Sequence, residues 1–156
     1  MNLLQLNTSV EKLRFLQDYN VPARDVFSFF SDHNRWSEVY PAIIRRLTDS
    51  VDPRNANGLG SSRIIAMFPT IFQETITKYE EGNLIEYKIT FGSPFKNYVG
   101  NMRFVDLGNG KSRLDYSIEF EPRIPKTGFI LRNLVEKRVG DAIRELAHRF
   151  DKNPNY

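Results

Sequence analysis

The chain contains no cysteine and little histidine, and these shortages narrow its chemistry. None of the 156 residues is cysteine, which excludes disulfides, thiolate metal sites and cysteine nucleophiles. The two histidines, His33 and His148, lie far apart in sequence. A zinc site or a histidine-centred triad is therefore not predicted. No nucleotide-binding motif is present either, so we expect no cofactor.

Long apolar runs and basic stripes are missing too. No apolar run approaches the ~18 residues of a membrane span, and the first 15 residues do not have the pattern of a secretory signal. The formal charge is only +3, with lysine and arginine interspersed among acidic residues, so no nucleic-acid partner is predicted. We expect a single cytoplasmic domain over residues 1–156 without integral membrane association. Transient membrane contact and the oligomeric state stay open.

The chain does contain predicted strands and helices that occupy separate parts of the sequence. Ala23, Val26, Phe27 and Phe30 follow the i, i+3, i+4, i+7 spacing of a short amphipathic helix over 22–31. A second short helix is predicted at 35–40, and a long one at 127–152. Extended segments are predicted at 9–19, 43–47, 63–68, 71–80, 84–91, 97–107 and 112–120.

Strands and helices that are separated along the chain favour an α+β fold. Short turns between the extended segments predict an antiparallel meander of six to seven strands. A final helix of about 25 residues would span roughly 37 Å, close to the width of the domain. A curved sheet crossed by one such helix can leave a cavity between the two layers, which is a common ligand site.

The order of elements and several local patterns together resemble one superfamily. The patterns are Val21-Pro22-Ala23, Trp36, Tyr40-Pro41, the turn 57–60, and the strand pair around 74–77 and 84–87. The chain resembles the SRPBCC superfamily of START lipid-transfer domains, birch-pollen-type allergens and polyketide cyclases. Its nearest likeness is to the bacterial polyketide cyclase/dehydrase and lipid-transport-like branch. The resemblance implies a helix-grip fold, with a curved sheet around a long C-terminal helix and two short helices after the first strand.

Alternation along the strands predicts which side chains face the cavity. Tyr87, Tyr98 and Tyr116 each share a face with apolar neighbours. Three phenols could thus point into one apolar space and contact a ligand. The alternative for each is a packed aromatic ring whose hydroxyl bonds a backbone group or water.

Glu74 has the same parity as Phe72 and Ile76, which predicts that it faces inward. Burial would raise its pKa and suit it to acid/base chemistry beside a tyrosine donor. The alternative is an ion pair across the sheet with Arg63 or Arg103.

The remaining candidates lie on the final helix and in the first half of the chain. Arg138 borders the apolar face of that helix, where it could bind an anionic head group or only extend to solvent. Phe129 could cap the entrance or pack the helix start onto the sheet. Phe30, Trp36 and Tyr40 should close one end of the core. His33 falls between the short helices, where a solvated or capping role is expected.

We therefore expect a cavity that binds a small hydrophobic or aromatic ligand, of lipid or polyketide type. An enzyme of the cyclase/dehydrase type, with Glu74 as the catalytic residue, is one alternative. A domain with a filled core that binds a protein partner is another. A cavity below about 300 Å³ would count against a drug-sized ligand. The predicted cavity residues are Phe30, Trp36, Tyr40, Met67, Phe72, Glu74, Tyr87, Ile89, Phe91, Tyr98, Met102, Tyr116, Ile118, Phe129, Leu134 and Arg138.

Overall fold

The computed structural model describes residues 9–156, and over these residues seven strands form one antiparallel sheet beside three helical segments. The strands are β1 (Glu11–Tyr19), β2 (Ile43–Thr48), β3 (Ser62–Met67), β4 (Thr70–Glu80), β5 (Leu84–Gly92), β6 (Phe95–Gly108) and β7 (Lys111–Pro122). The helical segments are α1 (Ala23–Ser31), the 3-10 helix η1 (His33–Glu38) and α2 (Gly128–Lys152). The predicted α+β fold and its order of elements are confirmed.

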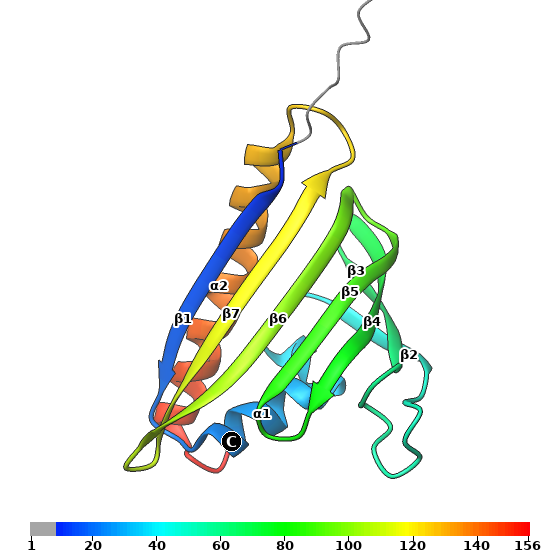
Figure 1. Cartoon of the computed structure of the whole chain (residues 1–156). Helices are drawn as coiled ribbons and strands as arrows, with labels where there is room; N and C mark the ends of the chain where they lie inside the picture. The colour runs from blue at the N-terminus through cyan, green and yellow to red at the C-terminus, as the bar shows by residue number, and fades with distance from the viewer. Residues whose placement is uncertain (1–8) are drawn as a thin grey trace, which may run out of the picture.

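The sheet is an open meander to which the first strand adds at one edge. Its order is β1-β7-β6-β5-β4-β3-β2, so β2 to β7 lie side by side in chain order and β1 adds beside β7. Short turns join the later strands, and Asn109 and Gly110 take positive φ values of 53° and 71° in the β6–β7 turn. In Figure 1 the strands curve in front of α2, which packs on β1 and β7. This is the helix-grip arrangement.

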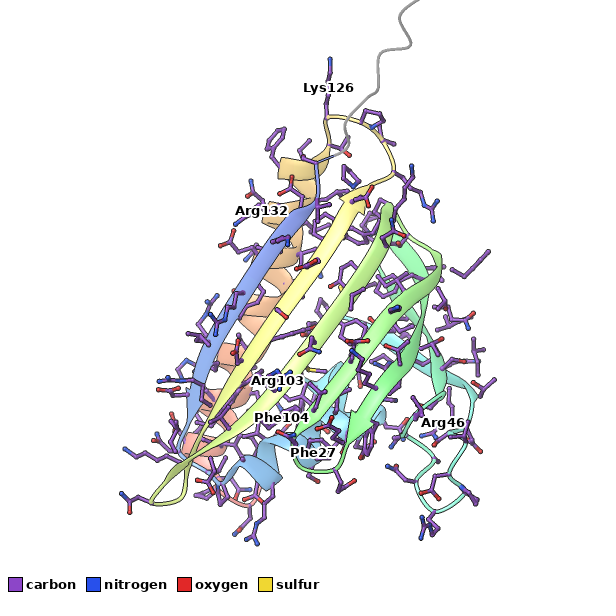
Figure 2. The ribbon with its side chains drawn as sticks, in the orientation of Figure 1. Phe27, Arg46, Arg103, Phe104, Lys126 and Arg132 are labelled. Atoms are coloured by element: carbon purple, nitrogen blue, oxygen red, sulfur yellow. The ribbon has the colours of Figure 1, made fainter. Side chains whose placement is uncertain are left out.

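The two short helices close one end of the space between the layers. Pro22 directly precedes α1, and Asp25 lies in its first turn, where a negative charge is favourable. The Asp32 side chain accepts a hydrogen bond from the Asn34 backbone N–H at 3.1 Å and so begins η1. Phe27 of α1 packs edge-to-face on Phe104 of β6 with ring centroids 5.1 Å apart (Figure 2).

One face of α2 supplies the other wall. Its buried side chains recur at helical spacing, among them Leu131, Val135, Val139 and Ile143. Arg149 lies in the last turn, where a positive charge complements the helix dipole. No helix within residues 9–156 is long and apolar enough to cross a membrane.

A bulge in β5 changes the expected orientation of Phe91. Gln73 pairs with Phe91 while Glu74 pairs with Ile89, so Thr90 is an extra residue on β5. Because one inserted residue reverses the alternation, Ile89 faces inward and Phe91 does not. Phe91 is 76% exposed, and its predicted inward orientation is wrong.

Candidate ligand-binding site

An apolar cavity lies between the inner face of the sheet and α2. Its volume is about 90 Å³, and the whole hollow, including the part open to solvent, is about 770 Å³. The larger volume includes solvent outside the wall. By the 300 Å³ criterion this cavity does not enclose a drug-sized molecule.

Most of the predicted cavity residues contribute to this wall. Eleven of the sixteen do so: Trp36, Tyr40, Met67, Phe72, Glu74, Tyr87, Ile89, Tyr98, Tyr116, Leu134 and Arg138. The wall also includes residues that the prediction omitted: Ala42, Ile44, Ile65, Phe68, Pro69, Thr70, Phe95, Val135 and Val139. Whether any of them contacts a ligand stays a prediction.

The other five predicted residues do not line the cavity, for two different reasons. Phe30, Met102 and Ile118 are at most 1% exposed and are packed in the surrounding core. Phe91 and Phe129 instead face solvent, the first because of the bulge and the second because it lies in the first turn of α2 with 64% of its surface exposed.

Three phenols form a hydrogen-bonded cluster inside the wall. The Tyr87 hydroxyl contacts the Tyr116 hydroxyl closely and lies 3.5 Å from the Tyr98 hydroxyl. Burial raises the pKa of all three, and the neighbouring tyrosines raise those of Tyr87 and Tyr116 further. The phenols are therefore neutral at pH 7. Two mutual hydrogen bonds use two of their three protons, so one hydroxyl proton can be donated to another group.

Gly100 makes room for this cluster. It lies opposite Tyr87 in the β5–β6 pairing, and a Cβ atom built on it would overlap the Tyr87 ring and hydroxyl. The residue at position 100 must therefore lack a side chain for Tyr87 to keep its orientation.

Glu74 faces inward, as its strand parity predicts, and it pairs with Arg63, while its acid/base role stays a prediction. It is 4% exposed, and the Arg63 Nη2 donates to its Oε2 at 2.8 Å. Arg63 is directly opposite Glu74 in the β3–β4 pairing and is 1% exposed. Burial raises the pKa of Glu74 and lowers that of Arg63, and each partner opposes the shift of the other. An arginine stays protonated in proteins, so Glu74 faces a permanent cation.

His33 is the third member of this buried group, and its predicted solvated position is wrong. It is 6% exposed, and its Nε2 lies 2.6 Å from the Arg63 Nη1. Because arginine can only donate, Nε2 accepts, and the neutral ring carries its proton on Nδ1. Burial lowers the pKa of His33 to about 2, with further lowering by Arg63 and Arg46.

Trp36 packs against the Arg63 member of this group, while Glu74 itself lines the cavity. The Arg63 guanidinium lies over the indole ring, 4.2 Å from its centroid, and the indole N–H donates to the Phe30 carbonyl at 2.9 Å. Only one buried side-chain polar atom in the described part of the chain, the Arg63 Nε, has no partner. Charge at this inner end is thus compensated by His33, Glu74 and the π face of Trp36.

The sequence analysis named Arg63 only as an ion-pair partner of Glu74 and did not predict its burial at the inner end of the cavity. A signal was available, because Arg63 has the same strand parity as Ile65 and Met67, which face the cavity. His33 gave no such signal. It follows α1 in an aperiodic segment, and its partner is 30 residues further along the chain.

The mouth lies where the β3–β4 turn approaches α2. Phe68, in the turn, is 89% exposed, and the Arg138 Nη2 donates to its carbonyl at 3.4 Å. Leu134 of α2 is 37% exposed beside them in the wall. Glu74 lies four residues along β4 from Thr70 at the mouth, which is about 13 Å of strand. The entrance is thus lined mainly by apolar side chains with the Arg138 guanidinium at its edge, and the Glu74 carboxylate lies at the inner end.

No metal site is evident among residues 9–156, where no three histidine, aspartate or glutamate side chains are grouped to hold an ion. The polar chemistry available to a ligand is therefore one carboxylate, a set of phenols and, at the mouth, one guanidinium.

Solved structures similar to this chain include a START superfamily protein and two enzymes. A START superfamily protein from Mycobacterium smegmatis matches with 15% identity and a TM-score of 0.77, over 90% of this chain and 97% of that one. The Zhui aromatase/cyclase from Streptomyces sp. R1128 matches with 13% identity and a TM-score of 0.77, over 94% and 98%. Norcoclaurine synthase from Thalictrum flavum, in complex with dopamine and hydroxybenzaldehyde, matches with 14% identity and a TM-score of 0.67, over 96% and 93%.

At these identities the likeness shows the fold alone. No curated protein sequence matches the chain. The sequence pattern of one family does match, over residues 12–153, and that family is described as polyketide cyclase/dehydrase and lipid transport. The chain belongs to the polyketide cyclase/dehydrase and lipid transport family.

Proposed function

We propose that this protein binds a small hydrophobic or aromatic ligand in the cavity between the sheet and α2. The observation that carries the proposal is the polarity of the wall. A mainly apolar wall leads to an inner end where Glu74 can accept a hydrogen bond and the tyrosine cluster can donate one. An apolar body with a hydroxyl or carbonyl group at one end fits this arrangement.

The small volume limits how that ligand is held. A cavity of about 150 Å³ is enough for one benzene ring, and the present one is about 90 Å³. A ring therefore fits only if part of it stays in the open mouth or if the wall widens. Phe68 and the Arg138 hydrogen bond to it lie at the mouth and are the contacts that such widening would change first.

The only tryptophan of the chain, Trp36, lies in the cavity wall, so its emission can report binding directly. Titration with 2-naphthol and with decanoic acid should change this emission in a saturable way. Ala42→Leu places a larger side chain in the cavity and should raise the apparent dissociation constant of each probe at least tenfold. Ala147→Leu is the matched control, since Ala147 is partly buried outside the cavity.

Equal titrations for the two variants, with melting temperatures unchanged, would contradict a ligand site in this cavity. A wild-type protein that binds neither probe, and no other hydrophobic compound, would favour the alternative of a filled core with a protein-binding surface.

A cyclase/dehydrase activity is the second candidate, supported by the carboxylate and phenols at the same inner end. In such a reaction Glu74 would take a proton from a carbon next to a carbonyl, and that carbon would attack a second carbonyl of the chain while a phenol donates a proton to its oxygen. Water would then leave when the phenolate takes a second proton from the same carbon and Glu74 returns the first proton to the hydroxyl. The Arg63 cation disfavours this role because it stabilises the ionised carboxylate and so weakens it as a base. Mass spectrometry of a bound poly-keto compound separates the two. An enzyme would release water from it, and Glu74→Gln would stop that loss, whereas a binding protein would return the compound unchanged.

A further inference from the structure

Three segments that are distant in sequence meet at the end of the molecule that holds the cavity mouth. They are residues 66–72, 89–96 and 122–132. Phe72 pairs with Gly92, and the Arg123 backbone N–H donates to the Pro94 carbonyl at 2.9 Å. The Arg138 hydrogen bond joins the first segment to α2. We call these three segments together the mouth surface. In Figure 1 the β5–β6 turn and the loop before α2 lie at one end, and α1 lies at the other.

The mouth surface exposes large apolar side chains. Phe68, Phe91 and Phe129 are 89%, 76% and 64% exposed, and they are the only exposed phenylalanines within residues 9–156. Ile124, in the loop before α2, is 65% exposed. Several exposed aromatic side chains at one end of a molecule are typical of a surface that contacts a partner or a membrane.

The charge of the mouth surface has one sign. Its 26 residues include Lys96, Arg123, Lys126 and Arg132 and no aspartate or glutamate, whereas the whole chain has 22 basic and 19 acidic residues. Two acids border it: Glu121 accepts a hydrogen bond from Asn97, and Glu11 lies 3.7 Å from the Arg132 guanidinium. The charge available to a partner therefore rests mainly on Lys96, Arg123 and Lys126. Lys126 extends from the tip of this end in Figure 2, and the labelled Arg46 lies at the opposite end.

Exposed phenylalanines beside basic side chains fit an anionic bilayer. Apolar side chains insert at the boundary of head groups and acyl chains, and lysine and arginine are attracted to anionic lipids. A protein partner complementary to this surface would need acidic groups around an apolar pocket, and nothing in the structure specifies one. We infer that the mouth surface docks on membranes that contain anionic phospholipid. Docking would place the cavity mouth against the lipid, and only this consequence rests on the proposed function.

The inference is tested by sedimentation of the whole protein with vesicles of phosphatidylcholine alone or with phosphatidylglycerol. Binding should require phosphatidylglycerol and weaken as salt rises. Lys96→Gln with Lys126→Gln should weaken binding by about fivefold per lysine, or roughly 25-fold. Lys111→Gln with Lys152→Gln removes the same charge away from the mouth surface, at the start of β7 and the end of α2, and should have little effect.

A second pair of variants tests the apolar part. Phe68→Ser should weaken binding by about tenfold or more, because the ring no longer enters the lipid. Val51→Ser is the control, since Val51 is 76% exposed in the loop between β2 and β3. Circular dichroism of each variant confirms that it is folded.

The inference would be overturned by no sedimentation with either vesicle or by equal sedimentation with both. Equal losses of vesicle binding in the test and control variants would also overturn it. A wild-type dimer that Phe68→Ser converts to a monomer would also overturn it, because the surface would then join two copies of the chain. Vesicle binding that persists while Trp36 emission responds to no ligand would contradict the proposed function and leave membrane docking intact.

Discussion

The burial of His33 predicts a specific loss of stability in mild acid. The ring is 6% exposed and accepts a hydrogen bond from Arg63, and its pKa is lowered to about 2. A histidine in the unfolded chain titrates near 6.5. Between these two values the unfolded chain binds a proton that the folded protein does not bind. Stability is therefore lost as the pH falls from 6.5 toward 2.

The size of the effect follows from the two pKa values. One pH unit below 6.5 costs about 1.4 kcal/mol, so a change from pH 7.5 to pH 5.0 should cost about 2 kcal/mol through this residue alone. Carboxylates also titrate in acid, so the informative quantity is the difference between the wild type and His33→Gln. Glutamine offers an oxygen to Arg63 in place of Nε2 and does not titrate.

The assay is urea unfolding of both proteins at pH 7.5 and pH 5.0. The loss between the two pH values should be smaller in His33→Gln by about 2 kcal/mol. His148→Gln is the control, because His148 is the other histidine and is exposed. Equal losses in wild type and His33→Gln would refute the reasoning, since they would mean that His33 binds a proton in the folded protein as readily as in the unfolded chain.

Two further predictions concern the same inner end and the tyrosine cluster. Arg63→Met and Glu74→Gln should each destabilise the fold by about 3–5 kcal/mol, because each leaves a buried charge without its opposite charge. The double variant should cost less than the sum in urea unfolding, and strict additivity would contradict the pairing. Gly100→Ala should destabilise by about 1–3 kcal/mol because its Cβ would overlap Tyr87. Gly140→Ala should be neutral or stabilise by up to about 1 kcal/mol, since only the flexible end of a side chain is near, and equal melting temperatures for the two alanine variants would contradict this difference.

The strands of the sheet could be read from the sequence because alternation is a local signal. Tyr87, Tyr98 and Tyr116 were predicted to face inward on three strands, and all three are at most 7% exposed. Glu74 followed the same rule. The signal failed at Phe91, since a one-residue bulge leaves no mark in the alternation of the neighbouring residues.

The charged group at the inner end could not be assembled from the sequence in the same way. Arg63 and Glu74 are 11 residues apart, and their pairing depends on the register of β3 and β4. His33 depends on the placement of η1 against that sheet, which no local pattern specifies. The size of the cavity was also beyond the sequence, because it depends on how completely side chains from several elements fill one space.

The central claim is that the cavity holds a ligand, and native mass spectrometry of the protein purified from cell extract tests it most directly. The account predicts that the wild type carries a small hydrophobic molecule, at up to one copy per chain, and that Ala42→Leu carries much less of it. Ala147→Leu should retain it. A wild-type protein with only the mass of the polypeptide, which also fails to take up a hydrophobic compound supplied in excess, would contradict the account.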